Sequence, residues 1–94
     1  MMDREPKRDT NEVAMLNEDK LIGKFQRNAR EEIRVLLRNY KGTDLFDIRS
    51  FYKAEDGEFK PGKDGIAVRI EKLPVLRELI NEAYQRAVQE GLLD

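Results

Sequence analysis

The chain contains neither cysteine nor histidine among its 94 residues, and these two absences restrict its chemistry. No disulfide can form without cysteine, and a metal site without either residue lacks the common soft ligands. Ser50 is the only serine, and no histidine or cysteine is present to complete a nucleophile–base pair of the usual kind. The sequence therefore predicts a protein that is not an enzyme and that needs no metal or other cofactor.

Long apolar runs are also absent. No segment approaches the roughly 20 apolar residues that span a bilayer. The first ten residues, MMDREPKRDT, have no apolar centre of the kind found in a secretory signal. We therefore expect no membrane partner and a cytoplasmic location, at the nucleoid in a bacterium or in the nucleus in a eukaryote.

The apolar content is modest, since hydrophobic and charged residues each make up 39% of the chain. One small domain with a thin core is expected. A domain of this size often needs a disulfide, a metal or a partner subunit to be stable. The first two are unavailable, so the sequence predicts an oligomer, most simply a homodimer.

Charge is distributed unevenly around a formal net charge of −1. Residues 1–22 hold four basic and six acidic side chains, residues 24–53 hold eight and four, and residues 71–94 hold three and five. A positive central segment can bind a polyanion even when the whole chain is nearly neutral. We expect residues 1–22 to form a flexible charged tail and residues 23–94 to form the domain.

Apolar residues alternate with polar ones in two central segments. The alternation predicts strands over 32–40 and 45–53, separated by a break at Lys41-Gly42-Thr43. Asp-Gly within residues 55–58 predicts a hairpin with a tight primed turn, followed by a short third strand at Phe59. Pro61-Gly62 is typical of a type II turn, and a fourth strand is expected over 66–70.

The period becomes helical after residue 72, with Pro74 suited to the first turn and Gly91 to the end of the helix. The apolar stripe consists of Leu73, Leu76, Leu79, Ile80, Ala83, Tyr84, Ala87 and Val88. The predicted fold is α+β, a four-stranded antiparallel sheet followed by one C-terminal helix (ββββα). The helix is expected to cover one sheet face and also to form the dimer interface with the edge strand Gly65–Ile70.

The other sheet face would hold rings and cations together. Its cations are Arg34, Arg38, Lys41, Arg49 and Lys53, and its rings are Tyr40 and Tyr52. Single-stranded nucleic acid is bound by cations for phosphates and by rings for bases, although an ordinary outer sheet face has the same residue types. Tyr52 lies on the Phe46 side of a regular strand, and only a bulge would turn it to the Arg49 side. A protein-interaction module that docks an acidic partner is the alternative function.

Two stretches resemble a known family: YKGTDLFDIR (residues 40–49) and DGEFKPGKDGIAV (residues 56–68). From about Phe25 to Ile80 the chain is similar to the transcriptional coactivator family of human positive cofactor four, which includes bacterial and phage relatives. The resemblance implies a curved four-stranded sheet with a helix, paired as a homodimer. It also implies binding of single-stranded DNA without much sequence preference, binding of melted duplex, and a role in transcription, replication or repair.

The resemblance also implies which residues bind nucleic acid. They are Arg38, Tyr40, Lys41, Arg49, Tyr52, Lys60 and Lys63, to which the sheet pattern adds Arg34. Asp64 departs from the family, where a lysine often precedes Gly-Ile, and residues 1–22 lack the serines of the human regulatory tail. Besides single-stranded DNA, the expected partners are RNA or melted duplex, a second copy of the chain, and transcription or replication proteins.

Overall fold

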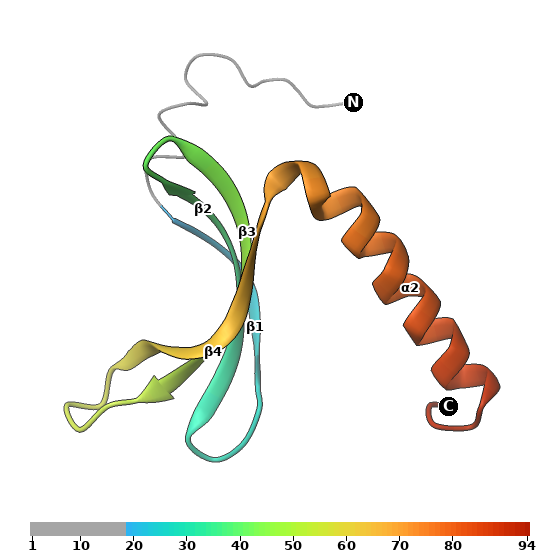
Figure 1. Ribbon diagram of the computed structural model, residues 1–94. Coiled ribbons are helices and arrows are strands. Elements are labelled where there is room, and N and C mark those ends of the chain that lie inside the picture. The colour runs from blue at the N-terminus through green and yellow to red at the C-terminus, as the bar shows by residue number, and fades with distance from the viewer. Residues whose placement is uncertain (1–18) are drawn as a thin grey trace.

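The computed structural model describes residues 19–94 and shows a curved antiparallel sheet followed by a single long helix (Figure 1). The strands lie in the order β1-β2-β3-β4, so β1 and β4 are the edges of the sheet. The elements are β1 (Lys20–Gln26), β2 (Glu31–Tyr40), β3 (Thr43–Lys53), β4 (Phe59–Arg69), a 3₁₀ turn (Ile70–Lys72) and α2 (Leu73–Gln89). The predicted α+β class, with four antiparallel strands before one C-terminal helix, is confirmed.

Strand β1 was not predicted from the sequence. It includes residues 20–22, which we assigned to the tail, whereas residues 1–18 of that tail lie outside the described part of the chain. Leu21 pairs with Leu36 and Gly23 pairs with Val35, so one extra residue, Ile22, forms a bulge. The bulge shifts the inward and outward alternation by one position, which hides the strand from a period-two pattern.

Strand β4 replaces the two short strands and the type II turn that the sequence predicts. Arg49 pairs with Gly65 and Phe51 pairs with Pro61, so β4 advances four residues where β3 advances two. The two extra residues lie within residues 62–64, which we call the β4 bulge. Pro61 is tolerated because β4 is an edge strand and its missing N–H removes no bond from the sheet interior.

The two hairpins that position the site have different turns. Tyr40 pairs with Thr43 across a two-residue turn in which Lys41 and Gly42 have φ of 51° and 85°, as a type I′ turn requires. The hairpin predicted at residues 55–58 is confirmed, but its primed turn is wrong. Only Gly57 has positive φ there (87°), and its N–H donates to the Ala54 carbonyl at 2.9 Å.

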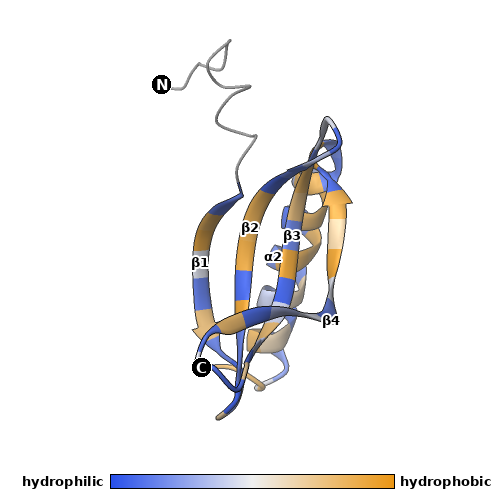
Figure 2. Cartoon of the chain, turned by 90° about the vertical axis from the view of Figure 1, so that its left-hand side faces the viewer, coloured by the Kyte–Doolittle hydropathy of each residue, from blue (hydrophilic) through white to orange (hydrophobic). Residues whose placement is uncertain are grey.

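Successive side chains of a strand point to opposite faces of the sheet, and hydrophobic and hydrophilic residues alternate along β2 and β3 (Figure 2). The β2–β3 register is unbroken from Glu31–Tyr52 to Tyr40–Thr43. It defines an apolar face, composed of Ile33, Val35, Leu37, Phe46, Ile48, Ile66 and Val68. It also defines a polar face, composed of Glu32, Arg34, Leu36, Arg38, Tyr40, Asp47, Arg49 and Phe51.

Helix α2 begins and ends as predicted but covers neither face of its own sheet. Pro74 lies in its first turn and Gly91 follows its end with φ of 77°. The helix stands away from the strands (Figure 1), and none of its residues is buried. Within residues 19–94, Leu36 is the only buried apolar side chain, 9% exposed. The single chain therefore leaves most side chains of its apolar sheet face only half-buried and most of its apolar helix stripe exposed.

Candidate nucleic-acid interface

Tyr40 and Lys41 lie at the tip of the β2–β3 hairpin. The type I′ turn brings the Lys41 ammonium to 5.3 Å from the centre of the Tyr40 ring, within the range of a cation–π contact. Asn39 supports the turn, since its side-chain oxygen accepts a hydrogen bond from the Gly42 N–H at 3.1 Å. Tyr40 remains 56% exposed. The hairpin thus presents an accessible ring beside an accessible cation.

The prediction that Tyr40 and Tyr52 share one sheet face is wrong, because Tyr52 lies on the opposite face from Tyr40. Because β3 pairs with β2 without a bulge, Tyr52 stays on the Phe46 side, and the irregularity that could have turned it belongs to β4. Tyr52 is 44% exposed and pairs across the strands with Lys60, whose ammonium lies 3.5 Å from the Asp56 carboxylate. A second ring and cation therefore lie together, at the other end of the sheet from the hairpin tip.

Arg34 is largely enclosed by its neighbours. Its guanidinium donates to the Glu32 carboxylate at 2.6 Å and lies 4.5 Å from the centre of the Phe51 ring and 5.7 Å from that of Phe59. Its side chain is 22% exposed. The sequence places Arg34 among the phosphate-binding cations, but the structure shows its charge balanced by a carboxylate and its guanidinium in contact with two phenylalanine rings.

Arg38 and Arg49 share one buried carboxylate. Arg38 Nη1 donates to Asp47 Oδ2 at 2.7 Å, and Arg49 Nε donates to Asp47 Oδ1 at 3.2 Å. The hydrogen bond that Arg38 donates to Asp47 is the main cause that raises the pKa of Arg38 above its usual value, with partial burial acting in the opposite direction. Asp19 adds a further contact, 3.4 Å from Arg38 Nε. Both arginines are therefore oriented by protein groups rather than free.

The β4 bulge presents Lys63 and Asp64 to solvent. Asp64 Oδ2 lies 3.5 Å from Nη1 of Arg27, a residue of the β1–β2 loop that the sequence did not single out. Among residues 19–94, no carboxylate lies within ion-pair distance of Lys41, Lys53 or Lys63, and all three are exposed. Of the predicted cations, these three have the most charge available to a polyanion in the described part of the chain.

The sequence missed Asp47 and Arg27 for different reasons. An acidic residue in a strand usually faces water, and nothing in the local pattern marks Asp47 as buried. The contact of Arg27 with Asp64 joins residues 37 positions apart and depends on the unpredicted β1 strand and β4 bulge. The one clue in the sequence was that Asp47 lies two residues before Arg49, on the same face of the predicted strand.

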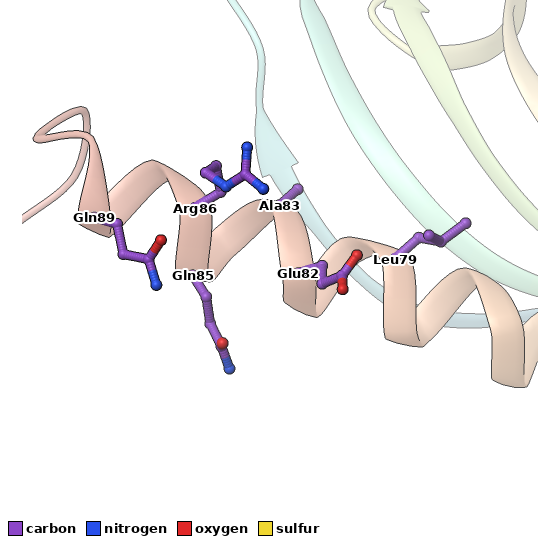
Figure 3. A pocket seen from close by; sticks show the side chains of 6 residues that line it. All are labelled: Leu79, Glu82, Ala83, Gln85, Arg86 and Gln89. Atoms are coloured by element: carbon purple, nitrogen blue, oxygen red, sulfur yellow. The ribbon is translucent and has the colours of Figure 1, made fainter.

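A hollow lies on α2, away from the sheet residues named above. It is a shallow hollow lined by Leu79, Glu82, Ala83, Gln85, Arg86 and Gln89 (Figure 3). All six residues belong to one helix, so the hollow is bounded on one side only. Within residues 19–94, no three acidic side chains gather as ligands for a metal ion, and α2 is too short and too polar to cross a membrane.

Comparison with solved structures identifies the same fold in several proteins. A PC4 homologue from Burkholderia pseudomallei, known in two crystal forms, is 32% and 33% identical with TM-scores of 0.58 and 0.59. These matches cover 71% and 70% of this chain and 92% and 98% of the homologue.

Two more distant structures share the fold. The bacteriophage T5 homologue of the coactivator PC4, implicated in recombination-dependent DNA replication, is 20% identical with a TM-score of 0.58, and the match covers 81% of this chain and 84% of that one. The MoSub1–DNA complex is 23% identical with a TM-score of 0.54, and the match covers 73% and 84%.

The family model described as Transcriptional Coactivator p15 (PC4) matches residues 27–79, which is more than half of the chain. The matched segment contains β2, β3, β4 and the first part of α2, as well as every residue that the sequence assigned to the interface. Together with the Burkholderia homologue, this match shows that the chain belongs to the PC4 family of transcriptional coactivators.

Proposed function

We propose that this protein binds single-stranded DNA without sequence preference and thereby supports transcription, replication or repair. The observation on which the proposal rests is that each exposed tyrosine of the sheet lies beside an exposed lysine. Tyr40 contacts Lys41 at the hairpin tip, and Tyr52 is the cross-strand partner of Lys60. Family membership supports it, as do the DNA in the MoSub1 complex and the replication role of the T5 homologue.

The tyrosines favour single strands over duplex. A ring can stack on a base only where the base is not already stacked between neighbours, and each such contact is worth roughly 1–3 kcal/mol. Lysines beside the rings neutralise the phosphates that follow the stacked bases, and this part of the binding depends on salt. Melted duplex and RNA also offer unpaired bases, so both are expected to compete to some degree.

We further propose that the binding form is a homodimer. The helix stripe is exposed at Leu79, Ile80, Tyr84 and Val88, and complete burial of one such side chain stabilises by roughly 1.5–3 kcal/mol. A second copy offers the same stripe and the same apolar sheet face, as a two-fold interface requires. Light scattering at micromolar concentration should give twice 11.0 kDa. A persistent species of the chain mass would contradict the dimer.

A competition experiment tests the DNA proposal. Protein bound to labelled oligo-dT is challenged with unlabelled oligo-dT, its duplex counterpart, an RNA of equal length and polyglutamate. Unlabelled oligo-dT should compete much better than duplex or polyglutamate. Four to six phosphate contacts predict a slope of log K against log[salt] of about −3 to −4. Equal competition by duplex would remove the stacking argument.

The second candidate function is a protein-interaction module that docks an acidic partner, such as a transcription or replication protein. Lys41 and Lys63 would bind the carboxylates of such a partner as well as they bind phosphate. Binding to an acidic partner would not require the two exposed rings. Polyglutamate as the best competitor would favour this function. We propose that the protein acts at the genome, in the cytoplasm at a bacterial nucleoid or in a eukaryotic nucleus.

A further inference from the structure

Asp47 is the most enclosed charged side chain in residues 19–94, with 1% of its surface exposed. It lies on the polar face in the middle of β3, opposite Leu36 of β2 and Ala67 of β4. A buried carboxylate without partners is strongly destabilising. Its burial between three strands therefore needs compensating partners, and the chain provides two.

The two partners come from neighbouring strands and occupy both carboxylate oxygens. Arg38 of β2 donates to Oδ2 at 2.7 Å, while Arg49 of β3 contacts Oδ1 through Nε and Nη2, each at 3.2 Å. Hydrogen bonds between ionised groups are stronger than neutral ones and more exacting in geometry. The directions of both guanidinium groups are therefore fixed by one carboxylate.

Arg49 extends the contact to the β4 bulge. Its remaining terminal nitrogen, Nη1, donates to the carbonyl oxygens of Gly62 at 3.2 Å and Lys63 at 3.3 Å. Strand pairing with β3 is interrupted at this bulge, so these carbonyls accept from a side chain where the sheet ladder is broken. The planar fork of Arg49 thus joins a buried carboxylate on one side to the backbone of the bulge on the other.

We infer that Asp47 is a positioning residue of the nucleic-acid interface. It holds Arg38 and Arg49 in place and, through Arg49, sets the shape of the bulge that presents Lys63. Asp47 does not touch nucleic acid itself, because it is buried. This inference rests on the proposed function and deepens it. Arg49 then acts through the geometry of its fork rather than as a simple positive charge.

Two substitutions separate geometry from charge. Asp47→Asn keeps the shape but removes the charge that orients both arginines, and Arg49→Lys keeps a cation but removes the fork. We expect each to weaken binding of oligo-dT by about tenfold or more in folded protein. The double variant should bind oligo-dT as well as the more weakly binding single variant, because both changes break the same chain of contacts from Asp47 through Arg49 to the β4 bulge. Glu78→Gln, which removes an exposed carboxylate of α2, is the matched control and should bind normally.

Amide hydrogen exchange without DNA provides the second readout. Asp47→Asn and Arg49→Lys should increase exchange at residues 62–65 while leaving β1 and β2 protected. Unchanged exchange at residues 62–65 would overturn the positioning role. So would normal binding by Arg49→Lys, additive losses in the double variant, or tighter binding with a steeper salt slope in Asp47→Asn. The last result would show that Asp47 only neutralises the arginines.

The two readouts also separate this inference from the proposed function. If the unmodified protein fails to bind oligo-dT, the proposed function fails and Asp47 positions no DNA-binding surface, whatever the exchange data show. If the unmodified protein binds and the variants exchange normally at residues 62–65, only the positioning role fails. Melting curves of all variants at equal protein concentration establish the folded fraction used for each affinity.

Discussion

Removal of the Tyr52 ring is the most direct test of the proposed interface. A stacked base is worth roughly 1–3 kcal/mol, so Tyr52→Ala should raise the Kd for oligo-dT by roughly 5- to 150-fold. The slope of log K against log[salt] should change little, because no cation is removed. Tyr52→Phe keeps the ring and should bind nearly as well as the unmodified protein.

Stability must be measured beside affinity, because the ring is also partly packed. Tyr52 is 44% exposed, and a Cβ placed at Gly62 would lie 3.7 Å from its Cδ1. Loss of the packed half of the ring costs up to about 3 kcal/mol by area, or a melting point lower by roughly 10–20 °C. The anisotropy titrations should be carried out well below the melting point of the variant. A lower melting point with unchanged affinity would refute stacking and leave Tyr52 a packing residue.

Four further substitutions test the dimer and the packing of the sheet. Ile80→Asp places a charge in the exposed helix stripe and should convert a dimer to a monomer in light scattering; a persistent dimer would exclude α2 from the interface. Ser50→Ala removes a buried hydroxyl without a hydrogen-bond partner among the described residues and should raise the free energy of unfolding by about 1 kcal/mol; a lower melting point would show that the hydroxyl is satisfied. Gly65→Ala would place a Cβ 2.8 Å from a backbone oxygen and should cost about 1–3 kcal/mol, whereas Gly23→Ala meets no atom within 4 Å and should be nearly neutral.

The sequence predicts β2, β3 and α2 because each keeps a single period along its length. Ile33, Val35 and Leu37 alternate without interruption, and the two-residue turn at Lys41-Gly42 fixes their register with β3. An unbroken pattern specifies both the strand and the face of each side chain. Tyr40 and Lys41 could therefore be placed at the hairpin tip from the sequence alone.

Strand β1 could not be predicted, and β4 was predicted only as two short strands, because each of these edge strands contains a bulge. Ile22 shifts the period of β1, and the β4 bulge adds two residues beside Pro61-Gly62, a pair that locally favours a turn. Pairing with a neighbouring strand overrides that local preference, and an edge position tolerates the proline. The Asp47 contacts were missed because the pattern of one strand does not distinguish a buried aspartate from a solvated one, and the burial of Asp47 depends on pairing with both neighbouring strands.

The structure changes what is expected of Asp64, the residue that departs from the family pattern. Its carboxylate is exposed and lies 3.5 Å from Nη1 of Arg27. Opposite charges at this distance attract by about 1 kcal/mol in water, and an exposed pair nets less than that. Arg27 therefore offsets part of the repulsion that Asp64 exerts on a nearby phosphate. While it is paired with Asp64, Arg27 has less of its own charge available to bind phosphate.

Graded substitutions at Asp64 measure whether the β4 bulge borders the nucleic acid. Asp64→Asn removes the repulsion and releases Arg27, and Asp64→Lys also adds a cation, which should steepen the salt slope by about 0.7 for one new phosphate contact. Affinity for oligo-dT at low salt should rise from the unmodified protein to Asp64→Asn to Asp64→Lys, with melting points nearly equal because a solvent-exposed bulge residue has few packing contacts to lose. Arg27→Gln should weaken binding in the unmodified protein. If all these titrations superimpose, the β4 bulge lies away from the DNA. Lys60 and Lys63 are then no longer assigned to the interface.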